Sequence, residues 1–250
     1  MKEYSVDKMR TTTRIKIYLR SKLLFLVKVQ QFLYKFKTYR AKFRAYYLDN
    51  GWNNLETLSG SGSTLRATRA VRRQLPQLLE TYKIHTVVDI PCGDFNWLKE
   101  VNLDGIDYLG IDIVKEMINS NISKYRRKNI NFKCADLMND KLPRADLIIC
   151  RDCLIHYSTK YVFKAFKNMR ASRSTYLLST TYTEVDINTE IKAVGLFRPI
   201  NLAQHPFNFP QPLFIFDEDG DNGKSLGLWR FSDILEGSGA HERAPVAHHH

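Results

Sequence analysis

Apolar residues recur in two alternating patterns along residues 64–231. Short apolar runs between polar or glycine-containing turns are typical of buried strands, and segments with an apolar residue every three or four positions are typical of amphipathic helices. Because the two patterns alternate, the sequence predicts a mostly parallel sheet with helices on both faces, a Rossmann-like doubly wound α/β fold. The predicted strands are His85–Ile90, Asp107–Ile111, Ile130–Ala135, Ala145–Cys150 and Thr175–Thr181, and the predicted helices are Thr64–Tyr82, Val114–Arg127 and Thr159–Ala171.

The last part of this region breaks the alternation. Two apolar runs, Leu213–Phe216 and Leu226–Phe231, follow each other with only the turn-rich segment 217–225 between them. Two runs joined this closely are typical of a hairpin. We therefore expect a seven-stranded sheet that ends in an antiparallel pair.

Residues 14–47 show a third pattern, that of a basic amphipathic helix, either continuous or broken. Thirteen of the first 50 residues are Lys or Arg and three are Asp or Glu, so this part carries +10 of the formal net charge of +12. Its longest purely apolar run, Leu23–Val27, is far shorter than the roughly 20 residues that cross a bilayer. The segment is therefore predicted to be a basic arm and not a membrane span.

Three uses of this arm stay open. A basic amphipathic helix can lie on an anionic membrane surface, with aromatic side chains at the interface and lysines among the headgroups. It can equally pack on its own domain or on a second subunit and leave its basic face in water. Binding of a nucleic acid, whose phosphates a basic arm neutralises, is a weaker third alternative.

The chain is predicted to have three parts: the arm over 1–47, one domain over 48–236, and a linker with a histidine tag over 237–250. Apolar residues make up 44% and charged residues 26%, which is typical of a globular protein. The four cysteines are too few for a disulfide scaffold and indicate buried thiols in a reducing compartment. Because no apolar signal segment opens the chain, we expect a cytoplasmic protein that the arm could hold at the periphery of a membrane.

Three acidic residues close successive predicted strands. Asp89 ends the first strand, and the turn after it contains Gly93, which would let the backbone approach a ligand closely. Asp112 and Asp136 end the next two strands, and the carboxyl ends of strands meet at the ligand-binding crevice of an open α/β sheet. Carboxylates there can accept hydrogen bonds from both hydroxyls of a ribose and from the amine of an adenine. The absence of a G-x-G-x-x-G fingerprint and of a P-loop disfavours NAD-type and NTP-type cofactors.

Four motifs carry a resemblance to a known family. Over about residues 50–236 the chain resembles a class I S-adenosylmethionine-dependent methyltransferase, and the motifs resemble a bacterial and viral group associated with surface-glycan synthesis. This implies S-adenosylmethionine as the cofactor and, by association only, methylation of a sugar hydroxyl on a surface glycan or glycolipid precursor. The motifs are Ser59-Gly-Ser-Gly-Ser-Thr64, Asp89-Ile-Pro-Cys-Gly-Asp-Phe-Asn-Trp97, Cys150-Arg-Asp-Cys-Leu-Ile-His156 and Pro206-Phe-Asn-Phe-Pro210.

The resemblance also implies roles for single residues. Asp94 stands where the family commonly has a flanking glycine, and we expect it to contact the amino group of the cofactor. Arg151, directly after the fourth strand, would face the methyl group. The remaining roles are the methionine part for Asp89 and Gly93, the ribose for Asp112, and the adenine for Asp136 and Leu137.

Methyl transfer to a sugar hydroxyl requires a group that takes its proton. Asp152 and His156 are the candidates, because one helical turn would separate them if a helix began after the fourth strand. Cys153 is interpreted as a packing residue, since no partner that would activate its thiol is visible. No metal site is predicted.

Residues 180–212 follow the fifth strand as a long segment rich in proline and aromatic residues, which we expect to form a lid over the acceptor. Arg198, His205 and Asn208 could bind sugar hydroxyls or a phosphate there. The alternative is that the prolines only route the chain to the terminal hairpin.

Two other functions stay open. An RNA or DNA methyltransferase would use the arm as its electrostatic contact, although the catalytic domain has little excess positive charge. A non-catalytic module would use the cofactor fold as a scaffold and the arm for docking, which the complete set of three acids disfavours. The oligomeric state is not predicted.

Overall fold

The computed structural model describes residues 38–193, 195–218 and 223–234, together with Arg20. The chain separates into two compact units, one up to Lys42 and one from Phe43 onward. Of the first unit, the described residues include little more than the first turn of helix α2 (Tyr39–Leu48). The predicted tag and most of the predicted arm lie outside the described residues.

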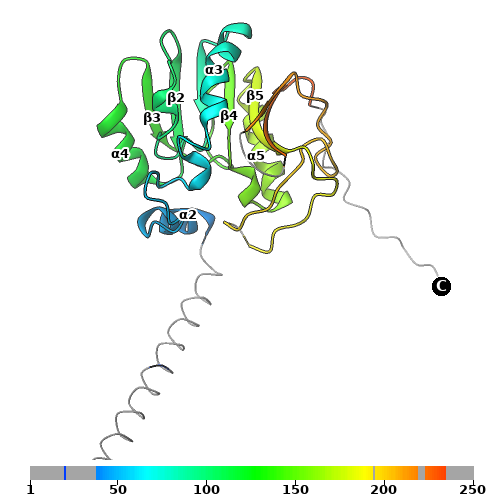
Figure 1. Ribbon diagram of the computed structural model, residues 1–250, viewed down its shortest axis with the longest axis horizontal. Coiled ribbons are helices and arrows are strands. Elements are labelled where there is room, and N and C mark those ends of the chain that lie inside the picture. Colours follow the sequence, from blue (N-terminus) through cyan, green and yellow to red (C-terminus); the bar gives the residue numbers. More distant parts are fainter. Residues whose placement is uncertain (1–19, 21–37, 194, 219–222, 235–250) are drawn as a thin grey trace, which may run out of the picture. The chain divides into compact units, whose positions relative to one another are not determined.

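Within the described residues, seven strands form one sheet with the order β3-β2-β1-β4-β5-β7-β6. Neighbours among β1 to β5 pair in parallel, whereas β7 runs antiparallel between β5 and β6. Figure 1 shows the strands side by side, with α4 next to β3. The predicted Rossmann-like fold with a terminal antiparallel pair is thus confirmed. The strands are β1 (Thr86–Asp89), β2 (Asp107–Asp112), β3 (Ile130–Cys134), β4 (Leu147–Cys150), β5 (Tyr176–Tyr182), β6 (Phe214–Asp217) and β7 (Lys224–Arg230).

The helices of the described residues flank this sheet, and none of them is long and apolar enough to cross a bilayer. The helix predicted from Thr64 begins later, because the side chain of Thr64 accepts a hydrogen bond from the amide of Ala67 and Thr68 Oγ1 donates to the Thr64 carbonyl. Such side-chain bonds hold a tight turn in place of a first helical turn. The elements are α3 (Arg69–Thr81), α4 (Lys115–Tyr125) and α5 (Thr159–Ala171), with the short 3-10 helices η1 (Ser61–Ser63), η2 (Leu98–Glu100) and η3 (Leu154–His156).

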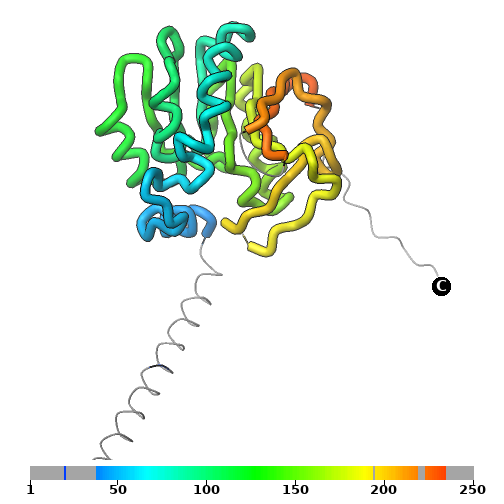
Figure 2. Tube along the Cα trace, in the orientation of Figure 1, coloured from blue at the N-terminus to red at the C-terminus, as the bar shows by residue number. Residues whose placement is uncertain are grey.

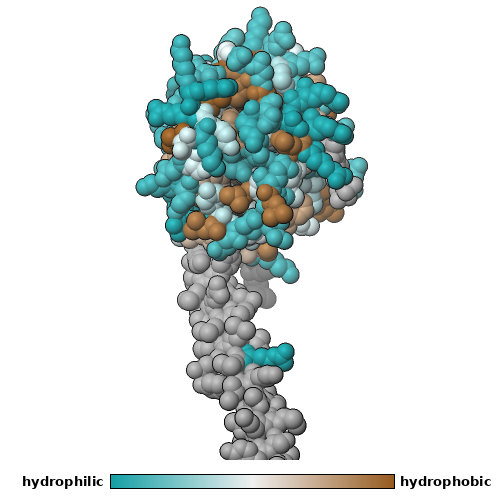
Figure 3. All heavy atoms as spheres, turned by 60° about the vertical axis from the view of Figure 1, so that its left-hand side comes forward, coloured by the Kyte–Doolittle hydropathy of each residue, from teal (hydrophilic) through white to brown (hydrophobic). Residues whose placement is uncertain are grey.

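The main apolar core lies between α3 and the sheet. Leu75 of α3 packs in one cluster with the strand residues Val87 and Leu147. Because side chains alternate between the two faces of a strand, Ile148 is buried on the opposite face. Burial on both faces explains the nearly continuous apolar strands. The side turned forward in Figure 3, by contrast, carries mostly polar side chains.

The direction of the strand order reverses at β1. The chain builds outward from β1 to β2 and β3, and then returns to the other side of β1 to place β4. The tube in Figure 2 follows this path and the later excursion of the chain between β5 and β6. Such a reversal opens a crevice at the carboxyl ends of the strands. All the residues predicted to bind the cofactor lie at or just after the ends of β1 to β4 and so gather at this edge.

Candidate functional site

A cavity opens at this edge of the sheet. It has about 970 Å³ of empty space, counting its mouth. The predicted residues that line it are Asp89, Gly93, Asp112, Leu137, Arg151, Asp152 and His156. The wall on the N-terminal side consists of Phe43, Tyr47, Trp52, Leu58, Ser59 and Ser63.

The turn after β1 brings the backbone close to this cavity. Gly93 has a φ of +57°, in the left-handed region that favours glycine. A Cβ at this position would overlap Ser59 Oγ, so a side chain would displace the 59–63 segment. The Gly93 amide donates to Asp112 Oδ2 at 3.2 Å, which links the ends of β1 and β2.

Two carboxylates are buried at the floor of the cavity. Asp89 accepts a hydrogen bond from the hydroxyl of Tyr108 at 2.8 Å, and Asp112 accepts one from the amide of Val114 at 2.9 Å. Burial raises the pKa of Asp89 to about 7 and the pKa of Asp112 to about 6. Ionised carboxylates in such a place gain most from a ligand that brings a cation or hydroxyl groups.

Asp94 lies elsewhere than the sequence suggested. Its carboxylate accepts hydrogen bonds from Thr57 Oγ1, the Leu58 amide and Ser59 Oγ, all between 2.8 and 2.9 Å. It lines a neighbouring cavity and not the one beside Asp89. Asp94 therefore anchors the 57–59 segment over the glycine turn, a role that a flanking glycine could not have.

Asp136 also points away from the cavity. Its carboxylate accepts hydrogen bonds from the Met138 amide and from Asn139 Nδ2, both at 2.8 Å. These bonds hold the turn after β3, as an aspartate commonly does at a turn. The side of the cavity expected to hold an adenine is lined instead by Ala135 and Leu137.

Four charged side chains form a closed network beside the cavity, here called the charge ring: Arg151, Asp152, Glu218 and Lys224. Arg151 binds Glu218 through two bonds, Nε–Oε1 at 2.6 Å and Nη2–Oε2 at 2.9 Å, and its Nη1 lies 3.1 Å from Asp152 Oδ2. Lys224 Nζ lies 2.7 Å from Asp152 Oδ2 and 2.6 Å from Glu218 Oε2. The ring joins the end of β4 to both strands of the hairpin.

Asp152 is consequently a poor proton acceptor. Although burial opposes its ionisation, the cations Arg151 and Lys224 lower the pKa of Asp152 to about 2. Its φ is +50°, so the helical turn predicted to begin here does not form. The hydrogen bonds of its carboxylate go to Lys224 and Thr180, and the predicted pair with His156 is not formed.

His156 lines the cavity and binds the segment after β5 through one ring nitrogen. Its Nδ1 lies 3.1 Å from the carbonyl of Leu196, so Nδ1 carries the proton and donates it to this bond. Burial lowers the pKa of His156 and keeps the imidazole neutral near pH 7. Nε2 then has the free lone pair. The ring centroid of Trp52 lies 5.1 Å from that of His156, and that of Phe43 lies 6.5 Å away.

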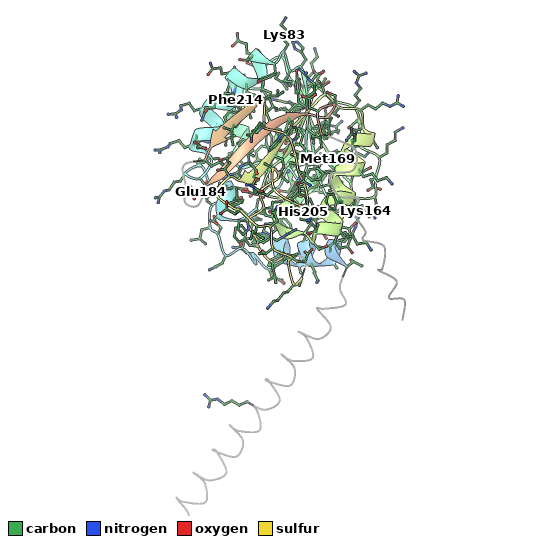
Figure 4. The ribbon with its side chains drawn as sticks, turned by 90° about the vertical axis from the view of Figure 1, so that its right-hand side faces the viewer. Lys83, Lys164, Met169, Glu184, His205 and Phe214 are labelled. Carbon is green, nitrogen blue, oxygen red and sulfur yellow. The ribbon has the colours of Figure 1, made fainter. Side chains whose placement is uncertain are left out.

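The residues expected to bind the acceptor do not line the cavity. Arg198 is buried and donates hydrogen bonds to the carbonyls of Thr189 and Tyr157, so it braces the segment after β5. His205, labelled in Figure 4, and Asn208 are exposed. This long segment instead holds residues of the cavity wall from behind: the Leu196 carbonyl bonds the His156 ring, and the Gly195 amide donates to the His156 carbonyl.

Sequence reasoning missed two groups of residues at the site. Phe43 and Tyr47 were assigned to the arm, yet they line the cavity, and the compact unit begins at Phe43 and not at residue 48. Their aromatic character, within an otherwise basic segment, was the available signal. Glu218 and Lys224 were read as parts of a turn, and only the register of the hairpin brings them to Arg151.

Residues 87–173, from within β1 to just past α5, match a family of methyltransferase domains. No curated protein sequence matches the chain. This match covers the turn after β1, the ends of β2 to β4, and η3.

Solved methyltransferase structures share the fold at low sequence identity. Magnesium protoporphyrin IX methyltransferase from Synechocystis PCC 6803 is 13% identical, with a TM-score of 0.55 over 78% of this chain and 97% of that one. The N-methyltransferase NodS from Bradyrhizobium japonicum WM9 is 14% identical, with a TM-score of 0.55 over 74% and 97%. The methyltransferase domain of bacterial CtHen1 is 14% identical, with a TM-score of 0.50 over 66% and 99%.

Proposed function

We propose that this S-adenosylmethionine-dependent methyltransferase is an O-methyltransferase whose acceptor is a sugar hydroxyl of a surface glycan or glycolipid precursor. The observation that carries the proposal is His156, a neutral imidazole that lines the cavity and whose Nδ1 proton is held by the Leu196 carbonyl. A hydroxyl keeps its proton near pH 7, so methyl transfer to it needs a group that takes this proton. A histidine held in this way supports a hydroxyl acceptor.

The cavity residues fit S-adenosylmethionine. Gly93 lines the cavity, and Asp89 and Asp112 are buried carboxylates suited to the ammonium group and the ribose hydroxyls. Leu137 supplies an apolar surface for the adenine. When bound, the cofactor would supply an electrophilic methyl group for transfer to the acceptor oxygen.

The protein orients the acceptor and accepts its proton. His156 Nε2 takes the proton of the hydroxyl, and the fixed anion of Asp152 stabilises the imidazolium that forms, because it raises the pKa of His156. Arg151 and Asp152 line the same side of the cavity, which makes this wall polar. Proton acceptance is therefore assigned to His156 alone, and Asp152 has a supporting role.

The opposite wall is aromatic and supports a ring-shaped acceptor. Trp52 stacks on Tyr46 with ring centroids 4.6 Å apart and planes 14° apart, which fixes the indole beside His156. Phe43 and Tyr157, at 5.6 Å from each other, add a second aromatic surface. Rigid aromatic faces suit the apolar face of a sugar ring, and the motifs that resemble surface-glycan methyltransferases favour the same substrate class.

A screen with cofactor labelled in its methyl group tests the proposal. Glycans, glycolipid precursors, RNA and DNA are offered to the full chain, and we expect alkali-stable label on a glycan or glycolipid only. Label on RNA or DNA would overturn the proposal in favour of a nucleic-acid methyltransferase. Absence of cofactor binding in a calorimetric titration would favour a docking module.

A further inference from the structure

The charge ring is neutral as a whole and almost closed to water. The side chains of Arg151 and Glu218 are 4% and 3% exposed, and those of Lys224 and Asp152 are 16% and 19% exposed. Removing four charges from water is costly unless every one is paired. The ring therefore contributes little to the net free energy of unfolding, and we look for its role in the side chain that it holds in place.

What the ring fixes is the carboxylate of Asp152. Lys224 Nζ binds Oδ2 from one side, and Arg151 Nη1 lies 3.1 Å from the same atom. A Cβ on Gly62 would lie 2.5 Å from this oxygen, so the backbone of η1 closes the other side. Arg151 also holds η1 through a bond from Nη2 to the Gly62 carbonyl at 2.8 Å. Asp152 thus has one available orientation.

Lys224 does not itself line the cavity, whereas Asp152 does. Glu218 pairs with Lys224 and also accepts two hydrogen bonds from Arg151. The hairpin thereby places the Lys224 cation against the carboxylate of Asp152, which lines the cavity.

We propose that Lys224 is a positioning residue for methyl transfer, which clamps the Asp152 carboxylate at the cavity wall beside His156. The inference rests on the proposed function, since it takes His156 as the proton acceptor. Without the clamp, Asp152 retains Arg151 and Thr180 as partners but loses its fixed orientation.

The charged groups around His156 make the pKa of its imidazole a second measurable property, besides activity, that depends on Lys224. The charged groups that act on its imidazole are Asp152, which raises its pKa, and Lys224, which lowers it. Tyr47, Tyr157 and Cys153 face the same cavity from the neighbouring elements, and Arg151 and Glu218 complete the ring. Loss of the Lys224 cation should therefore raise the pKa of His156, and an arginine at this position should not.

The test is an NMR titration of the His156 imidazole in the full chain without cofactor, with the signal assigned by its loss in His156→Ala. We expect a higher pKa in Lys224→Met and an unchanged pKa in Lys224→Arg. Lys164→Met is the matched control. Lys164 lies on α5, and its Nζ donates a hydrogen bond to Asn139 and not to a residue of the charge ring. If Lys224→Met does not fold, Lys224→Gln removes the charge while keeping a hydrogen-bond donor. An unchanged titration in a folded charge-free variant would overturn the inference.

Turnover provides the second readout. Because misplacement of a group by about 1 Å can cost on the order of 10²-fold in rate, we expect Lys224→Met to lower turnover on this scale with cofactor affinity retained. Lys224→Arg should recover most of the rate. Normal turnover in Lys224→Met would contradict the inference. If the wild-type chain methylates no glycan, the proposed function fails, while the titration still decides whether the charge of Lys224 acts on His156.

Discussion

Single buried carboxylates govern how the domain responds to pH. The pKa of Asp89 is raised from 3.8 in an exposed state to about 7, and that of Asp112 to about 6. Between about pH 4 and pH 7 the folded state therefore binds more protons than the unfolded state. Their contribution to the free energy of unfolding falls as the pH rises through this window, while the ionised forms that bind a cofactor become populated.

We expect Asp89→Asn to raise the melting temperature of the cofactor-free protein above pH 7, because it removes a buried charge and keeps an acceptor for the Tyr108 hydroxyl. The difference from the wild type should shrink towards pH 4, where the carboxyl is protonated in the folded state and about half protonated in the unfolded state. Thermal unfolding across this pH range measures it. Asp104→Asn, at an exposed position, is the control, and an equal effect of both substitutions would refute the assignment.

Cofactor binding should depend on the charge of Asp112. Loss of a charge-assisted pair with the ribose is worth about 1.5–3 kcal/mol, so Asp112→Asn should weaken cofactor affinity by roughly ten- to a hundred-fold in a calorimetric titration. Asn is preferable to Ala, because its single oxygen keeps an acceptor for one of the Gly93 and Val114 amides, whereas Ala leaves none for either. Unchanged affinity in the folded variant would remove Asp112 from the cofactor site.

His156→Ala should lower turnover by about 10²–10⁴-fold, because an alcohol keeps its proton at neutral pH without a nearby base. Cofactor affinity should be retained, as measured by the same titration. If the variant turned over at a near-normal rate, proton transfer would have to pass through water or another side chain.

At the scale of elements, the strands were predictable because strands that are buried on both faces have apolar residues at almost every position. Val87 and Ile148 lie on opposite faces of the sheet, and helices cover both faces, so apolar residues are required at every position. The helix predicted near Thr159–Ala171 is present as α5, with an apolar side that is buried.

The site was only partly predictable, because the apolar pattern of a strand does not fix where side chains in the turn after it lie. Asp112, the last residue of β2, lines the cavity, but Asp136, two residues beyond the end of β3, accepts hydrogen bonds from its own loop. The pairing of Arg151 with Glu218, separated by 67 positions, depends on hairpin register. No local pattern carries that information.

The short helix η1 should tolerate no side chain at Gly62. In Gly62→Ala the added Cβ would press on Asp152 Oδ2, and such overpacking typically costs about 1–3 kcal/mol. A lower melting temperature and weaker cofactor binding are expected. Ser61→Ala, exposed in the same element, should leave both unchanged. A Gly62→Ala protein as stable as the wild type would show that the charge ring can shift to make room for the added methyl group.

At the scale of the whole molecule, we expect that the arm can be removed as far as residue 37 without damage to the cavity, but not as far as residue 47. A chain of residues 38–236 keeps Phe43 and Tyr47 and should bind cofactor normally, whereas residues 48–236 should bind it more weakly. Calorimetric titration of both chains measures this. Equal affinities would mean that the aromatic wall serves only the acceptor.

The arm itself should bind anionic vesicles through its basic face, with an affinity that falls as salt screens the headgroups. Sedimentation with vesicles should recover the full chain, and residues 38–236 should stay in solution. Equal sedimentation of the two chains would leave packing on a partner as the function of the arm.

The position of β7 has a consequence for how a ribosome can make this protein. The last strand of the sheet lies between β5 and β6 and carries Lys224, so the nascent chain cannot close its sheet or balance the charges beside its cavity until residue 230 has emerged. Until then, β5 exposes an unpaired edge, and the two acids of the ring share the single cation Arg151. A stalled or prematurely terminated chain should therefore be catalytically silent and marked for proteolysis, which couples completion of synthesis to activity.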